Sequence, residues 1–272
     1  MQGHVYQAVT LTVFGNEHLR GIATAPSPNG AVAFRYSKST VFVDGPPAKG
    51  EANPLLASDP VAWFAWLKTQ GIRAIRMHHV PGETQYEDYN TVVFGGGGRW
   101  LIETATEKRS DFWQSHSEVV DQKAPDRRIW GDTFNRVAVN WQPRPAPLTD
   151  MAKSRADLAA VLPKVLAFAK AHEEKRDFAE FFERGIAALS SAAPLAKAAA
   201  PDIDACQSLT LPARQLLGAA GASWVFGGMS WWNDGGVADP EANKTYEILT
   251  PQLWDAVTNA IVAGANSSAV TL

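Results

Sequence analysis

The chain has 272 residues, of which 46% are hydrophobic and 19% charged, so it can bury a sizeable core and is not expected to be disordered. Its net charge is −3, its sequence pI is about 6.1 and its basic residues are scattered, which argues against nucleic acid as a partner. The single cysteine, Cys206, excludes an internal disulfide and a thiolate metal cluster, and no apolar run is long enough for a transmembrane helix.

The first part of the chain contains segments that are typical of β-strands. Residues 4–14 alternate between apolar and polar side chains, which predicts a half-buried strand. Two more strands are expected over residues 31–37 and 40–44, before a turn at Gly45-Pro46-Pro47.

One helix is expected in this region, directly after that turn. Ser58 or Asp59 can cap its N-terminus, and Pro60 suits its first turn. Gly71 can end it in the left-handed conformation that glycine adopts easily.

Consecutive hairpins are predicted after this helix. Residues 72–80 form a strand, and Gly95–Gly98 lies between the β-prone runs 91–94 and 100–104, which predicts a tight turn. A second hairpin is expected from residues 117–120 to residues 129–141. Because strands joined by hairpins pair antiparallel, the first half is expected to be a mostly antiparallel sheet with one packed helix.

The composition changes near residue 142. The segment 142–147 has proline at alternate positions, which predicts an extended linker, and the alanine-rich sequence after it predicts helices. We therefore expect an α+β fold with a β-sheet domain over residues 1–145 and a helical domain packed on it over 146–272, the boundary falling within residues 142–150.

Candidate catalytic residues are few. His78 and His79 end a predicted strand near Glu83, so either histidine could act as an acid or base beside Glu83 or Asp234. The two histidines are adjacent and would point to opposite faces of a strand, so they cannot chelate one metal without a bulge. We expect no metal and no cofactor.

The most distinctive segment is a glycine-flanked aromatic turn, in which a binding site of Trp231, Trp232, Asn233 and Asp234 is predicted. Glycines on both sides let the backbone bend sharply, and tryptophans at the tip of a turn project outward unless another element covers them. Such exposed tryptophans are typical of contact with a ligand or partner. The alternative is that both rings plug a gap between the two halves, since large aromatic side chains are mostly buried.

No segment carries the signature of a characterised family. The expected function is that of a cytoplasmic, bacterial, non-catalytic interaction protein, of an accessory or immunity type, that binds a protein partner through the aromatic turn. Two alternatives stay open. One is an enzyme with a histidine and carboxylates in a cleft between the halves, and the other is a small-ligand or glycan binder with tryptophan platforms. Neither nucleic acid nor a membrane is expected as a partner, and the oligomeric state is open.

Overall fold

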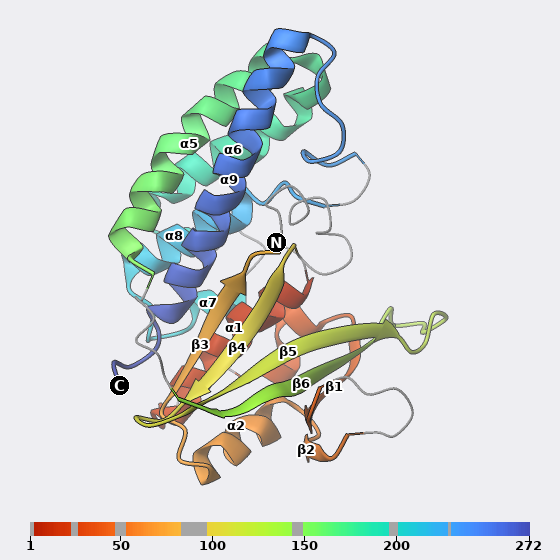
Figure 1. The fold of residues 1–272 in the computed structure, drawn as a ribbon, viewed down its shortest axis with the longest axis vertical. Coiled ribbons are helices and arrows are strands. Elements are labelled where there is room, and N and C mark those ends of the chain that lie inside the picture. The colour runs from red at the N-terminus through yellow and green to blue at the C-terminus, as the bar shows by residue number, and fades with distance from the viewer. Residues whose placement is uncertain are drawn as a thin grey trace.

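The computed structural model describes residues 3–22, 27–46, 53–82, 97–142, 149–195, 201–227 and 230–272. These residues form a six-stranded mixed sheet and seven α-helices, so the predicted α+β class is confirmed. Figure 1 shows the sheet in the lower part of the molecule and a bundle of helices above it.

The sheet has the strand order β2-β1-β6-β5-β4-β3. Only the β1–β6 pair is parallel, and every other neighbouring pair is antiparallel. The strands are β1 (Ser37–Asp44), β2 (Leu55–Ala57), β3 (Ala74–Val80), β4 (Arg99–Ala105), β5 (Ser110–Val119) and β6 (Trp130–Trp141).

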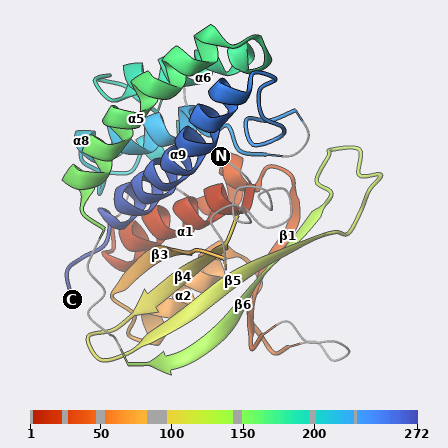
Figure 2. The same ribbon diagram turned by 45° about the horizontal axis from the view of Figure 1, so that its top comes forward.

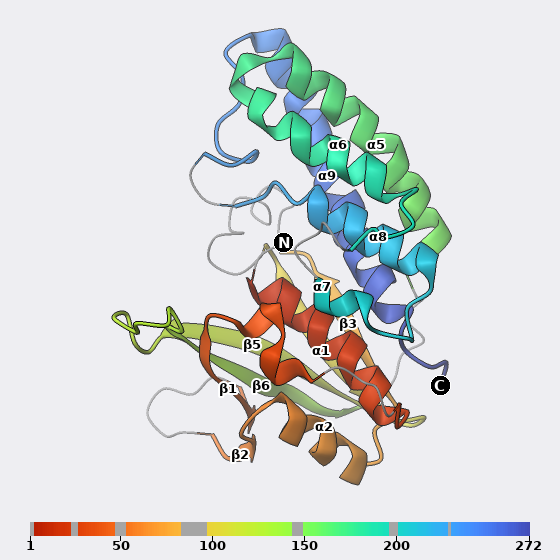
Figure 3. The same ribbon diagram turned by 180° about the vertical axis from the view of Figure 1, so that it is seen from behind.

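Two helices, α1 (Gly3–Leu19) and α2 (Pro60–Thr69), lie against one face of the sheet, as Figure 3 shows from behind. An aromatic cluster fills the space beneath α2. Phe42 of β1 stacks on Trp63 of α2 with ring centroids 4.3 Å apart, and Trp113 of β5 meets Trp63 edge-on at 5.3 Å. Among the described residues no helix lies on the opposite face, which we call the outer face (Figure 1).

The bundle consists of α5 (Met151–Ala171), α6 (Ala179–Ala188), α8 (Leu211–Ala222) and α9 (Pro240–Asn266), with the short α7 (Pro201–Asp204) beside it. Figure 2 shows α1 between α9 and the sheet, and α1 contacts α9, β3 and β4. One continuous hydrophobic cluster includes residues from both halves of the chain. The sheet ends at Trp141 and the bundle begins at Met151, while a division into two domains stays a prediction.

The strand predicted over residues 4–14 is wrong, because this segment is the helix α1. Every residue from Val5 to Glu17 is buried, since α1 has the sheet on one side and the bundle on another. A helix buried all round shows no apolar stripe of period 3.6, and so its sequence does not display helical periodicity. The strand predicted over 31–37 is also absent: the segment begins with a 3₁₀ turn, Val32–Phe34, and β1 starts at Ser37.

Several local predictions are confirmed. The Asp59 carboxylate accepts hydrogen bonds from the backbone N–H groups of Val61 and Ala62, and Gly71 has φ of +70°. β5 and β6 form the predicted antiparallel hairpin. Of the first predicted hairpin, residues 91–96 lie outside the described residues, and β4 pairs with β3 and β5.

Candidate functional site

The aromatic turn is described from Ser230 to Gly236, and we call it the 230–236 loop. Its second tryptophan, Trp232, is fully buried. The ring lies among aromatic side chains of the bundle, and its Nε1 donates to Thr250 Oγ1 at 3.0 Å. The neighbouring rings are those of Phe168, Phe178, Phe182 and Tyr246. Trp232 is therefore part of the core, and its prediction as an exposed binding residue is corrected.

A buried lysine holds the loop in place. Lys175 is 2% exposed, and its ammonium donates to the backbone carbonyls of Trp232 (2.9 Å), Asp234 (3.3 Å) and Gly235 (2.7 Å). Tyr246 Oη donates to the carbonyl of Trp232 at 2.6 Å, and the Lys175 ammonium lies 4.6 Å from the Tyr246 ring centroid. Burial lowers the pKa of Lys175, because removal from water disfavours the charged form. The three carbonyls replace the water that this ammonium lacks.

Polar side chains complete the loop. Asn233 makes a pair of hydrogen bonds with Gly227, accepting from its N–H at 2.9 Å and donating to its carbonyl at 3.0 Å. The carboxylate of Asp234 accepts from the backbone N–H of Ser230 at 2.7 Å, and Ser230 has a φ of +66°. Asn233 therefore fixes the loop to Gly227, and Asp234 shapes the loop through a contact within it.

Trp231 is the aromatic side chain that this loop exposes, with 37% of its surface accessible. Its ring lies directly over Gly227: a Cβ at that position would come within 2.6 Å of the indole. Glycine at 227 thus gives the indole a flat backbone support. The result is a tryptophan that is half exposed and held on a fixed backbone.

The structure shows how two of the predicted catalytic residues, His78 and His79, lie relative to each other. His78 and His79 point to opposite faces of β3, as their adjacency predicts. His79 Nε2 lies 2.9 Å from the carbonyl oxygen of Gly97, and its ring packs near Trp100 and Trp254. Glu83 lies outside the described residues.

His78 lies on the outer face, where it meets a carboxylate that sequence reasoning did not single out. Its Nε2 is 2.8 Å from Oε2 of Glu103 on β4. Ser110 Oγ donates to Oε1 of the same carboxylate at 2.5 Å, and Arg76 Nη1 lies 3.8 Å from Oε2. These four residues, Arg76, His78, Glu103 and Ser110, form what we call the outer-face cluster. It lies on the open face and not in the predicted cleft between the halves.

Glu103 is held in its charged form. Burial by itself raises its pKa, but the hydrogen bonds from His78 and Ser110 and the positive charges of His78 and Arg76 outweigh that effect. The net result is a pKa below the usual value. An ionised carboxylate only accepts hydrogen bonds, so His78 Nε2 carries the shared proton. This hydrogen bond orients the imidazole, and Nδ1 is the ring nitrogen that does not contact Glu103.

Glu103 and Lys175 each left a weak signal in the sequence. Glu103 is the one charged residue in the otherwise uncharged run 100–105, and such an isolated charge in a buried strand indicates a specific partner. The sequence does not identify that partner, because β3 ends at Val80 and β4, the strand that carries Glu103, begins only at Arg99. Lys175 lies in the charged stretch Glu173–Asp177, where nothing distinguishes it from its exposed neighbours.

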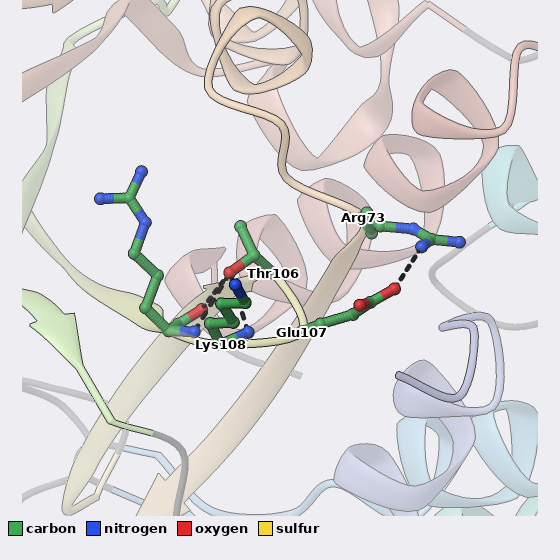
Figure 4. Close-up of a pocket in the computed structure, with 5 residues that line it drawn as sticks. Arg73, Thr106, Glu107 and Lys108 are labelled. Carbon is green, nitrogen blue, oxygen red and sulfur yellow. Dashed lines mark hydrogen bonds and ion pairs between the residues drawn. The ribbon is translucent and has the colours of Figure 1, made fainter.

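A shallow depression of about 410 Å³ lies at the turn between β4 and β5 (Figure 4). Arg73, Thr106, Glu107, Lys108 and Arg109 line it. Arg73 and Glu107 form an ion pair at 2.6 Å, with side chains that are 61% and 62% exposed. Such a solvated pair does not make an enclosed site.

Across the described ranges, no group of three or more histidine, cysteine or acidic side chains is placed to hold a metal ion. Within the same part of the chain, no helix has both the length and the apolar character required to cross a bilayer. A comparison of this chain with known protein families, with curated proteins and with solved structures finds no match.

Proposed function

We propose that this protein is a non-catalytic binding protein that contacts a protein partner through Trp231 on the 230–236 loop. The observation that carries the proposal is an exposed indole on a loop whose backbone carbonyls accept hydrogen bonds from the buried Lys175. A side chain that is already ordered loses little conformational freedom when it binds, and this favours affinity. Tryptophan is also enriched among residues that dominate binding energy.

A protein surface suits this site better than a glycan does. A stacking platform for sugars requires a broad aromatic surface, and the burial of Trp232 leaves a single exposed indole in this loop. One indole with a polar rim of Asn233 and Asp234 resembles the anchor of a protein interface, where an aromatic centre is surrounded by polar residues.

An enzyme is the second candidate, and the His78–Glu103 hydrogen bond favours it. A histidine that donates to a buried carboxylate is oriented for proton transfer at its other ring nitrogen. Trp231 and the outer-face cluster are on different parts of the molecule, so each candidate can be tested without disturbing the other.

The binding proposal is tested by affinity purification with the wild-type chain, Trp231→Ala and Trp130→Ala. Trp130 is a matched control because it is 38% exposed on the β5–β6 hairpin. We expect a partner that wild type and Trp130→Ala retain and Trp231→Ala loses, with a weakening of the purified complex by about 2 kcal/mol or more. Equal affinity of Trp231→Ala and wild type for every retained partner would refute the proposal.

A further inference from the structure

We propose that the outer-face cluster is a binding site for an oxyanion, a phosphate or carboxylate group, held between Arg76 and His78. This site is independent of the 230–236 loop and goes beyond the binding function proposed for it. The side chains of Arg76 and His78 lie on one face of β3 because they are two residues apart. Both contact the same carboxylate, that of Glu103, on the neighbouring strand.

The guanidinium of Arg76 has unused hydrogen-bond donors. Its side chain is 17% exposed and its closest charged contact, Nη1 to Glu103 Oε2, is 3.8 Å long, which is an ion pair without a good hydrogen bond. Arg76 Nε is buried and has no hydrogen-bond partner among the described residues. Burying a guanidinium whose N–H groups have no acceptor costs free energy, and a bound acceptor would remove that cost.

Glu103 does not fill that need, because better-placed donors occupy its carboxylate. Oε2 accepts from His78 at 2.8 Å and Oε1 accepts from Ser110 at 2.5 Å. With His78 protonated, two positive groups share one negative one. The cluster then has an excess positive charge that a bound anion would balance.

His78 is oriented to take part. In the imidazolium form both ring nitrogens donate, so Nε2 can hold Glu103 while Nδ1 holds the anion. The Phe112 ring, with its centroid 5.8 Å from that of His78, forms a side wall. Arginine pairs with planar carboxylates and with phosphates through two parallel N–H bonds, so both groups share the chemistry that this site offers.

The test is a titration of the full chain with inorganic phosphate and, separately, with acetate, followed by NMR of the His78 ring and the β3 and β4 amides. The titration is carried out in slightly acidic buffer. We expect saturable shifts centred on His78 and Arg76, and the stronger of the two anions identifies the ligand class. Absence of saturable shifts at these residues with both anions overturns the proposal.

Two variants that each lose one positive charge show which arginine binds the anion. Arg76→Gln is expected to raise the dissociation constant about tenfold or more, the loss of a charge-assisted hydrogen bond. Arg73→Gln removes an exposed arginine near the start of the same strand and is expected to bind as wild type does. The opposite ranking would assign the anion to the depression near Arg73 and overturn the proposal.

Arg76→Lys keeps the charge and the strand geometry, and it is the variant to test if Arg76→Gln does not fold. Since lysine lacks the planar fork, we expect it to bind the anion more weakly than wild type while it unfolds at a similar temperature. Wild-type affinity in Arg76→Lys would mean that a point charge suffices, and this would contradict a site built on the guanidinium.

Discussion

The side-chain amide of Asn266 makes both hydrogen bonds that a neighbouring strand would make with Met77. Oδ1 accepts from Met77 N–H at 2.7 Å, and Nδ2 donates to the Met77 carbonyl at 2.9 Å. Asn16 of α1 does the same for Ile75, at 2.9 Å and 2.8 Å. Met77 and Ile75 belong to β3, an edge strand of the sheet, so two asparagines cover polar groups that an edge otherwise exposes.

Asn266→Ala is expected to destabilise the fold by about 2 kcal/mol or more, because buried backbone groups without partners cost about 1–3 kcal/mol each. Denaturant unfolding gives the free energy, and hydrogen exchange of the Met77 amide reports the local opening. Asn259→Ala is the matched control, since Asn259 is exposed on the same helix and alanine favours helix. Equal stability of the two variants would show that the asparagine cover adds nothing.

Trp231→Ala and Trp232→Ala should differ strongly in stability. Trp232 is fully buried among aromatic rings, and its truncation is expected to cost about 3–5 kcal/mol of unfolding free energy. Trp231 is partly exposed and should cost clearly less. Urea titrations followed by circular dichroism compare the two, and a loss for Trp231→Ala as large as that for Trp232→Ala would make the indole structural.

Lys175→Met keeps the length of the side chain but removes the donors to three carbonyls of the 230–236 loop. We expect the free energy of unfolding to fall by about 2 kcal/mol or more. Hydrogen exchange should also become faster at the Trp232 amide, which donates to the carbonyl of Val225. Lys170→Met, on the exposed surface of α5, should change stability by less than about 0.5 kcal/mol. Unchanged exchange in Lys175→Met would show that the loop holds its shape without the ammonium.

The lowered pKa of Glu103 predicts that the folded protein loses stability in acid. Its pKa in the folded protein lies below the value of 4.5 for a free glutamate, so on acidification the unfolded chain takes up the proton first. The contribution is fully present above the unfolded value and is lost as the pH falls through the folded value. Melting temperatures measured across this range should fall less steeply in Glu103→Gln than in wild type, and parallel curves would contradict the assignment.

Cys206 should be unreactive in the folded protein. Its side chain is buried, and burial, with the nearby charge of Glu17 adding to it, raises the pKa of the thiol. A thiol reagent such as dithiobis(nitrobenzoate) should label the chain at the rate of global unfolding. Rapid labelling without denaturant would mean that the region around Cys206 opens locally.

Local sequence signals predicted the elements that depend on local chemistry. The α2 helix has its cap in Asp59 and ends before Gly71, and β5 and β6 pair as strands that are consecutive in the sequence. Each of these features depends on residues that are close together in the sequence.

The errors have a physical cause in long-range packing. The character of α1 depends on α9 and the sheet, whose contacts bury polar residues such as Thr10 and Thr12 together with apolar ones. The partner of His78 depends on the β3–β4 register, which places Glu103 opposite Arg76 and therefore diagonally across from His78. The burial of Trp232 depends on the bundle that covers it, and no residue near Trp232 in the sequence indicates that cover.

The position of α1 between the sheet and α9 also affects how the chain is made. Helix α1 is synthesised before α9, which begins at Pro240 and provides one of the surfaces that bury α1. At about 5–20 residues per second, roughly 10–45 s pass on the ribosome before that partner emerges. During this interval the apolar surface of the nascent α1 lacks its final cover, so this helix is the segment for which a molecular chaperone would compete.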